Sequence, residues 1–405
     1  MKASEAAAQP IPGYISLNYA DLFKIQQVRQ NIFVFRPVSF SSLAEYLECP
    51  GCALDRKRKK RTKEPKHFTH IHQTSLFGKG IPDPRLVGTL LHHVINLLHD
   101  TRGPLTDEQR RELLTDPGSL TRFLRRDLLQ LLRETEKLKL ALFLDELSAS
   151  EETLRTSLIV PLLRYREELV VSGSTVFAIA ERFQFKLAST SKTFIGHRDW
   201  GGDVAIVGEF DQIRLRNVAE GTGLTARPTI LDFKTGLGKK KRWDKVGEEG
   251  IPGSPQELTQ PGVAHAMQLA IYWMAFQTRW DVQEHVWLAR GGVEDIRMPL
   301  QQDLDLIVYN LYDGCQYQLL LTDVQEALRA LTNCIFHLNW AMKSGYAWQL
   351  PEHDCRKTPL LTEVPEPLIQ VGYESISAQE CYLLAQEAFR IFQKAVCWKR
   401  ITSES

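Results

Sequence analysis

Apolar residues recur at helical spacing in two stretches of the first hundred residues. In residues 85–99 the apolar positions that share one stripe are Val87, Leu91, Val94 and Leu98. The stripe beside it carries Gly88 and His92. In residues 37–54 a shorter apolar stripe follows serines that can cap a helix. The spacing therefore predicts one helix in each stretch.

A different pattern begins after residue 173, where β-branched and aromatic residues gather in short runs. The runs that predict strands are 174–187, 204–215, 228–233 and 283–289. The segments with helical spacing are a helical insert at about 100–175, then 263–279, 302–345 and 376–397. The segments whose composition predicts loops are 216–228, as a long hairpin loop, and 237–262. Helices and strands mixed in this order predict an α/β protein.

Composition is that of an ordinary globular protein. The 405 residues are 43% hydrophobic and 24% charged, which is enough to bury a large core. The longest apolar runs are too short to cross a bilayer. Residues 1–14 lack the apolar centre of a secretory signal. We therefore expect a cytoplasmic protein with no membrane partner, whose residues 1–36 form an N-terminal extension.

Charge is balanced over the whole chain but concentrated locally. The net charge of +1 gives no argument for nucleic acid by itself. Two basic runs do give one: residues 56–63, which include Arg56 and Arg58, and residues 239–245, which begin with Lys239, Lys240, Lys241 and Arg242. Each run could follow a phosphate backbone in bound DNA, or could be a solvated loop, and both alternatives stay open.

Two acids and a lysine lie near the ends of predicted strands. Asp211 lies on one strand, Asp232 ends the next, and Lys234 follows two residues later. Side chains two apart in a strand share a face, so Asp232 and Lys234 point the same way. Like charges in close contact are costly unless a cation lies between them. The pattern predicts a site for a hard divalent metal that acts on a phosphate. The alternative is a surface ion pair beside an acid that caps a turn.

The order of short motifs resembles that of the PD-(D/E)XK nuclease superfamily, in its RecB-type branch. The motifs are Gly88–His92 (GxxxH), Gly208–Asp211 (GxxD), Leu231–Lys234 (LDxK) and Gln268–Tyr272 (QxxxY). The resemblance implies a restriction-endonuclease-like α/β core, in which helices flank a mixed central sheet. With it we expect a nuclease core over residues 37–295 that contains the helical insert, followed by a helical C-terminal region over residues 296–405.

The resemblance also implies a set of metal ligands. They are the carboxylates of Asp211 and Asp232, the imidazole of His92 and the carbonyl of Phe233. His93 is a competing neighbour, and the spacing from the helix glycine favours His92. The ion implied is Mg²⁺ or Mn²⁺.

Further residues receive catalytic and positioning roles from the same resemblance. Lys234 would orient or help deprotonate the attacking water and offset negative charge in the transition state. Gln268 and Tyr272 are four residues apart and share a helix face, from which they would help hold the DNA strand. Glu181 is a candidate supplementary acid, with an exposed charge at a strand edge as the alternative.

An iron–sulfur cluster is the second cofactor that the resemblance raises. AddB-like subunits and CRISPR-associated adaptation nucleases hold a 4Fe–4S cluster with one cysteine before the core and three clustered after it. Cys49 matches the first position, but Cys355, Cys381 and Cys397 lie far apart. Cluster motifs usually keep short spacings, which counts against Cys49 as a ligand, and we expect no 4Fe–4S cluster.

Together these features predict a metal-dependent nuclease that hydrolyses DNA, acting on single strands or on DNA ends in repair or genome defence. No GxxxxGK(S/T) loop occurs, so any unwinding would come from a helicase or another partner protein. Two alternatives stay open. One is a DNA-trimming nuclease like those of CRISPR adaptation, and the other is a nuclease-like subunit that binds DNA or assembles partners without cleaving.

Overall fold

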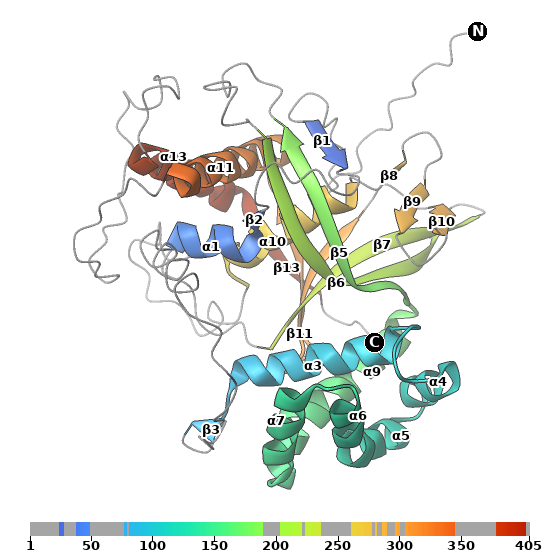
Figure 1. Ribbon diagram of the computed structural model, residues 1–405. Coiled ribbons are helices and arrows are strands. Elements are labelled where there is room, and N and C mark those ends of the chain that lie inside the picture. Colours follow the sequence, from blue (N-terminus) through green and yellow to red (C-terminus); the bar gives the residue numbers. More distant parts are fainter. Residues whose placement is uncertain are drawn as a thin grey trace.

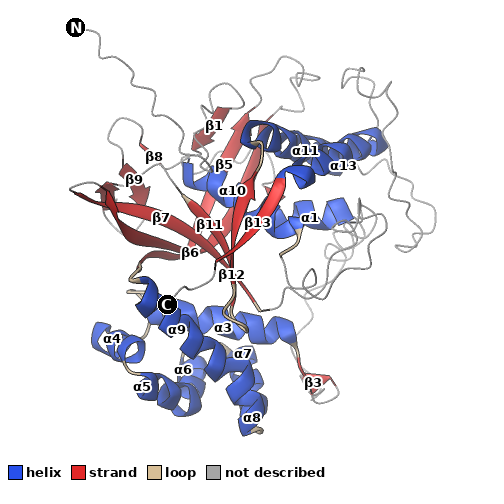
Figure 2. Cartoon of the chain, turned by 180° about the vertical axis from the view of Figure 1, so that it is seen from behind, coloured by secondary structure: helices blue, strands red, loops and turns tan. Residues whose placement is uncertain are grey.

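The fold is seen in a computed structural model of the 405-residue chain (Figure 1). The residues that the structure describes are 24–27, 38–48, 77–78, 81–188, 203–220, 223–235, 261–277, 280–281, 286–289, 296–299, 304–344 and 378–401. In this part of the chain, one large sheet lies between two groups of helices (Figure 1, Figure 2).

The central sheet is mixed, with the strand order β1-β5-β6-β7-β11-β12-β13 and the short β2 beside β6. Its strands are β1 (Lys24–Gln27), β2 (Val38–Ser39), β5 (Thr175–Ala188), β6 (Asp203–Glu220), β7 (Gly223–Lys234), β11 (Asp305–Asn310), β12 (Gln316–Leu321) and β13 (Val396–Ile401). β7 runs parallel to β11 and antiparallel to β6. β7 therefore lies in the middle of the sheet, with a hydrogen-bonded neighbour on each edge.

Two small sheets lie apart from the central one. They are formed by β3 (Phe77–Gly78) with β4 (Ile81–Pro82), and by β8 (Trp280–Asp281), β9 (Val286–Ala289) and β10 (Ile296–Pro299).

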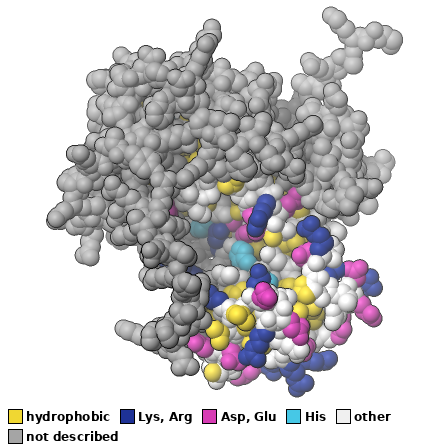
Figure 3. Space-filling model, viewed as in Figure 1, with side chains coloured by type: hydrophobic (Ala, Val, Ile, Leu, Met, Phe, Trp, Pro, Cys, Tyr) yellow, Lys and Arg dark blue, Asp and Glu magenta, His cyan; other side chains and the backbone are white. Residues whose placement is uncertain are grey.

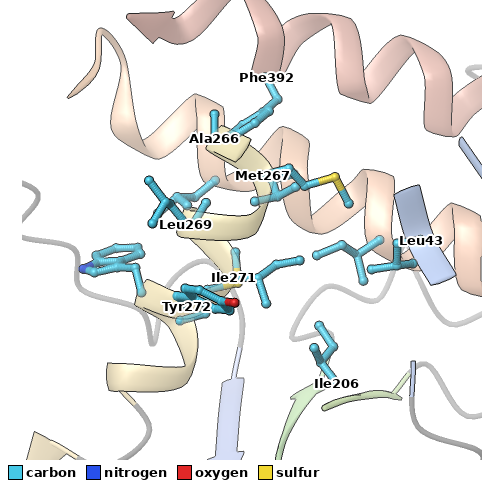
Figure 4. Close-up of a cluster of buried hydrophobic side chains, with 14 of the residues drawn as sticks. Leu43, Ile206, Ala266, Met267, Leu269, Ile271, Tyr272 and Phe392 are labelled. Atoms are coloured by element: carbon cyan, nitrogen blue, oxygen red, sulfur yellow. The ribbon is translucent and has the colours of Figure 1, made fainter. Parts of the chain in front are cut away.

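One face of the central sheet is covered by four helices. They are α1 (Phe40–Glu48), α10 (Val263–Gln277), α11 (Val324–Ser344) and α13 (Ala378–Ala395). Figure 4 shows the middle of this core, where α10 residues such as Met267 and Ile271 lie among Leu43, Ile206 and Phe392 from other elements. From residue 266 to 276 of α10, Gln268 alone is not fully buried. A helix enclosed on most sides needs this nearly continuous apolar surface.

The second group of helices packs on the other face, against Leu231 and Phe233 of β7. It consists of α3 (Pro84–His99) and the helical insert, with α4 (Asp107–Thr115), α5 (Pro117–Arg122), α6 (Leu128–Glu134), α7 (Leu138–Ser148), α8 (Glu151–Leu154), α9 (Val160–Ser172) and π-helical turns at Phe123–Asp127 and Arg155–Ile159. α3 begins at a proline, and Asp83 caps it by accepting a hydrogen bond from the Arg85 N–H. Cap and proline together fix where this helix starts.

The predicted fold class is confirmed, and most predicted elements have the predicted type. The long hairpin loop predicted at 216–228 is wrong. Those residues extend the β6–β7 ladder, from Arg216 opposite Arg227 to Glu220 opposite Gly223. The glycines and the proline were taken as loop signals, but the residues between them alternate well enough to pair as strands.

The continuous helix predicted over 302–345 is also wrong, because β11 and β12 occupy its first half and α11 begins only at Val324. A short buried apolar run such as that of β11 fits a helix and a central strand equally well. The overlooked signal is Asp313-Gly314, since Gly314 has a φ of 75° in the connecting turn. With β13 at the end of the chain, the predicted helical C-terminal region supplies three strands of the central sheet.

Candidate functional site

The end of β7 carries the central pair of the site, Asp232 and Lys234. Asp232 is fully buried, and Lys234 is partly buried. Lys234 Nζ lies 2.7 Å from Asp232 Oδ2. The alternation of side chains along the strand puts both on one face, as the sequence predicts. They form an ion pair at a buried position, not on the open surface.

Asp211 reaches the same strand end from β6. The register of β6 with β7 begins one residue later, with Gln212 opposite Leu231. Asp211 Oδ2 accepts a hydrogen bond of 2.9 Å from the N–H of Phe233, the residue between Asp232 and Lys234. The structure therefore brings the two predicted acids together at one place.

α3 adds His92 to this group. His92 Nδ1 lies 3.7 Å from Asp211 Oδ1. The imidazole also meets the ring of Phe233 edge to face, with centroids 5.9 Å apart. The neighbouring His93 has a different environment, where burial and then the charge of Lys137 lower its pKa. The structure thus places His92, and not the competing His93, beside the acids.

Gly88 lies one helical turn before His92 and explains how α3 can come this close. A Cβ atom built on Gly88 would lie 3.0 Å from Oγ1 of Thr235, the residue that follows Lys234. Any larger residue would have to push the helix or the threonine away. The glycine of the GxxxH motif therefore allows the close approach of α3 to the end of β7.

α10 closes the site from the other face of the sheet. Gln268 Oε1 accepts a hydrogen bond of 3.3 Å from Lys234 Nζ, and Gln268 Nε2 donates one of 2.7 Å to the hydroxyl of Tyr272. The ring of Tyr272 packs against Phe210, with centroids 5.4 Å apart. Lys234, Gln268 and Tyr272 therefore form a chain of hydrogen bonds, and Gln268 fixes the direction of the Lys234 ammonium.

The charges of the site act on one another strongly. Burial raises the pKa of Asp232 to about 7, although Lys234 opposes the rise. Burial also raises the pKa of Asp211. Burial alone would lower the pKa of Lys234, but the two carboxylates outweigh it, and this pKa is raised. Burial, followed by the charge of Lys234, lowers the pKa of His92. Lys234 is therefore charged at neutral pH, and His92 is neutral, the form that binds metals.

The donor atoms of the site fit a hard divalent cation. Both carboxylate oxygens of Asp232 are buried, and neither accepts a hydrogen bond of ordinary geometry from the described residues. Buried polar atoms normally have partners. Within the described ranges, no three His, Cys, Asp or Glu side chains stand ready as a metal cage. Mg²⁺ commonly takes one or two carboxylates and completes its shell with water and substrate phosphate, and Asp211 and Asp232 are the carboxylates at this place.

The other predicted residues have separate outcomes. Glu181 is partly buried in β5, opposite Phe210 and so one residue from Asp211 along β6, and its role stays a prediction. The basic residues Arg56, Arg58, Lys239, Lys240, Lys241 and Arg242 and the cysteine Cys49 lie outside the described residues. On the face shown in Figure 3, acidic and basic side chains intermingle over the helical part that carries the insert.

Two features of the site were missed in the sequence. Thr235 contacts α3 at Gly88, and its place directly after Lys234 was the available signal. Gly208 was considered only as part of the GxxD motif, yet a Cβ atom built on it would lie 2.3 Å from Cζ of Phe183. The ring of Phe183 occupies that space on the neighbouring strand, so the motif glycine makes room for the core beside Asp211.

Comparisons with known proteins agree with this geometry at the level of the family. In the described part of the chain, no helix combines the length and the apolar character needed to cross a bilayer. A comparison with curated proteins gives no match. Residues 37–341, about three quarters of the 405, match the family described as the PD-(D/E)XK nuclease superfamily. With the acids, the lysine and the helix histidine of the motifs gathered at one strand end, the chain belongs to the PD-(D/E)XK nuclease superfamily.

Proposed function

We propose that this protein is a deoxyribonuclease that needs Mg²⁺ or Mn²⁺. The observation that carries the proposal is the buried Asp232 carboxylate, which feels the charges of Lys234, Asp211 and His92 but, apart from its ion pair with Lys234, has no hydrogen-bond partner among the described residues. An enclosed group of this kind is costly to keep and is typical of a site that binds a cation.

Each residue of the site would have its own role in the reaction. Asp211, Asp232 and His92 would hold the ion, with the carbonyl of Phe233 as a further ligand. When bound, such an ion polarises the phosphodiester and lowers the pKa of water. The water oxygen forms a bond to phosphorus, the ester P–O bond breaks, and the leaving oxygen takes up a proton. Lys234, whose pKa is raised, serves as a fixed positive charge for the transition state and not as a base.

Gln268 supports this role because it accepts a hydrogen bond from Lys234 and is itself tied to Tyr272. An ammonium held in place before the reaction needs no reorganisation when negative charge develops. From the motif order we infer that Tyr272 would also help hold the DNA strand.

The finer assignment follows the motif order. We infer a RecB-type nuclease that acts on single-stranded DNA or DNA ends, in repair or genome defence, in the cytoplasm and with a helicase or similar partner. The helix with GxxxH before the core strands and the helix with QxxxY after them support this branch. The division into an extension (1–36), a core (37–295) and a C-terminal region (296–405) is part of the same proposal, although the central sheet takes strands from both sides of residue 295.

The test is a cleavage assay with purified protein on labelled single-stranded and double-stranded DNA, with and without free ends, and on RNA. We expect cleavage of DNA with Mn²⁺ or Mg²⁺ and none with a chelator. Asp232→Asn keeps the shape of the side chain but removes the charge, and should abolish cleavage. Asp145→Asn, at an exposed position of α7, is the matched control and should cleave normally. DNA that is bound but left equally intact by wild type and Asp232→Asn would identify a binding subunit instead.

A further inference from the structure

A second group of buried polar residues lies behind the site, between the helical insert and the sheet. We call it the support cluster, and its members are His99, Tyr165, Glu168, Gln212 and Arg214. Tyr165 of α9 is fully buried at its centre. Its hydroxyl lies 2.7 Å from His99 Nε2 of α3 and 2.8 Å from Gln212 Nε2 of β6.

The direction of each hydrogen bond at Tyr165 can be assigned. Arg214 Nε donates to Gln212 Oε1 over 2.6 Å, so the amide nitrogen of Gln212 is the atom that donates to the tyrosine oxygen. The tyrosine hydrogen is then left for His99 Nε2. Burial, followed by the charge of Arg214, lowers the pKa of His99 to about 3, so this imidazole is neutral and can accept. The hydroxyl therefore joins α3 to β6 in one defined arrangement.

The ring of Tyr165 makes the third connection, to β7. It meets the ring of Phe233 edge to face, with centroids 5.7 Å apart. Its other contacts include Arg214, whose Cζ lies 5.3 Å from the ring centroid. Arg214 in turn pairs with Glu168 on α9, Nη1 to Oε2 at 2.5 Å. One side chain of the insert thus contacts three elements that carry site residues.

Each of these contacts lies next to a candidate metal ligand. Gln212 directly follows Asp211 in β6. Phe233 directly follows Asp232 in β7, and its N–H holds the Asp211 carboxylate. His99 lies seven residues, about two turns, after His92 on the same side of α3. The relative positions of the three ligands therefore depend on what Tyr165 holds together.

We propose that Tyr165 is a positioning residue of the nuclease site, which sets the separation of His92, Asp211 and Asp232 from the side of the helical insert. The proposal rests on the proposed function, since it assumes that these three residues bind a metal ion. It makes the insert part of the catalytic apparatus and not only a cover for the sheet. Partners that keep ligands oriented commonly change metal affinity about 10–100-fold when removed.

The experiment compares wild type with Tyr165→Phe, which keeps the ring against Phe233 but removes the hydroxyl. Mn²⁺ binding is measured by calorimetry on the protein without DNA, and cleavage is measured as a function of Mn²⁺ and of DNA concentration. We expect Mn²⁺ binding about tenfold weaker, a matching rise in the Mn²⁺ needed for half-maximal cleavage, and an unchanged KM for DNA. The control is Leu147→Ala, which is fully buried in the insert core and takes no part in the hydrogen bonds or the Phe233 ring contact of Tyr165. It should lower the melting temperature and leave Mn²⁺ binding unchanged.

The outcomes separate this inference from the proposed function. Wild type that neither binds Mn²⁺ nor cleaves would overturn the proposed function, and this inference with it. Wild type that does both, beside a Tyr165→Phe variant with the same Mn²⁺ affinity, would overturn the positioning role alone. If Tyr165→Phe does not fold, His99→Leu removes the same hydrogen bond from the side of α3 and should show the same weakening.

Discussion

The site, on α3, β6, β7 and α10, and the support cluster, on α3, β6 and α9, are both groups of polar residues in the interior, yet they differ in how their charges are satisfied. In the support cluster the Arg214 guanidinium pairs with Glu168 and Gln212, and the Tyr165 hydroxyl has two partners. In the site, two carboxylates share one ammonium, and the oxygens of Asp232 accept no hydrogen bond within the described part of the chain. The support cluster uses its polar atoms within itself, whereas the site keeps acceptor oxygens without hydrogen-bond donors among the described residues.

The difference shows how a functional site can be told from a structural one on the same strands. The hydrogen bonds of the support cluster leave Arg214 Nη2 as its one buried nitrogen or oxygen without a partner among the described residues. A group satisfied in this way stabilises the fold and holds one geometry. In the site, by contrast, Asp232 has a pKa near 7, and burying this acid lowers the stability of the folded protein. Residues that cost stability in this way are typically kept for function.

The largest effect that would test this comparison is expected at Lys234. Lys234→Met keeps the length of the side chain and removes the charge, so the transition state loses its fixed cation. We expect cleavage to fall by about 10³-fold, equivalent to about 4 kcal/mol. The melting temperature should change little, because the side chain is partly exposed and the paired Asp232 can take up a proton. A large drop in melting temperature would instead show that Lys234 belongs with the structural group.

The opposite result is expected in the support cluster. Arg214→Met removes the charge that Glu168 and Gln212 face and leaves these partners buried without it. Breaking a buried pair from one side typically costs about 3 kcal/mol or more. Chemical denaturation should show this loss of unfolding free energy. If Arg214→Met were as stable as wild type, the view that the support cluster uses its polar atoms within itself would be refuted.

The two groups were not equally visible in the sequence. The site could be predicted because its residues fall in short motifs, and strand alternation alone places Asp232 beside Lys234. The support cluster could not, since Tyr165 meets His99 and Gln212 across 66 and 47 residues of sequence. Gln212 and Arg214 alternate with Ile213 and Leu215 in the way an exposed strand face does. Only the insert, packed on that face, makes them buried.

Helices and strands, too, could be predicted only where the signal is local in the sequence. Helices with caps and full apolar stripes, such as 84–99, were predicted within one residue at their start. β11 was not predicted, because its apolar run fits two kinds of element and because its parallel partner β7 is distant in sequence, with Asp305 paired to Thr229, 76 residues earlier. Pairings between distant segments are set by tertiary packing and not by local preference.

A smaller effect should appear in the pH dependence of stability. The folded protein binds a proton at Asp232 up to a pH of about 7, while an unfolded aspartate releases it near pH 4. Between these values the folded state holds more protons, so this group lowers the stability as the pH rises, by at most about 1.4 kcal/mol per pH unit. Melting temperatures in a chelator should therefore fall from pH 5 to 7.5 more steeply for wild type than for Asp232→Asn. Parallel curves would mean that Asp232 is not the strained acid described.

The smallest effect is expected where α3 meets the end of β7. Gly88→Ala adds a methyl group at 3.0 Å from Thr235 Oγ1, so helix and threonine must move apart by a few tenths of an ångström. Alanine favours the helix by up to about 1 kcal/mol, which offsets part of the crowding, and the melting temperature should barely change. Cleavage should nevertheless fall several-fold, because the shift carries His92 away from Asp211. The double variant Gly88→Ala with Thr235→Ala restores the space, and kinetic measurements on the four proteins of this cycle isolate the coupling between the two positions. Recovery of cleavage in the double variant, relative to Thr235→Ala alone, would show that the distance of α3 from β7 limits the reaction. Additive losses would place the effect of Gly88 elsewhere.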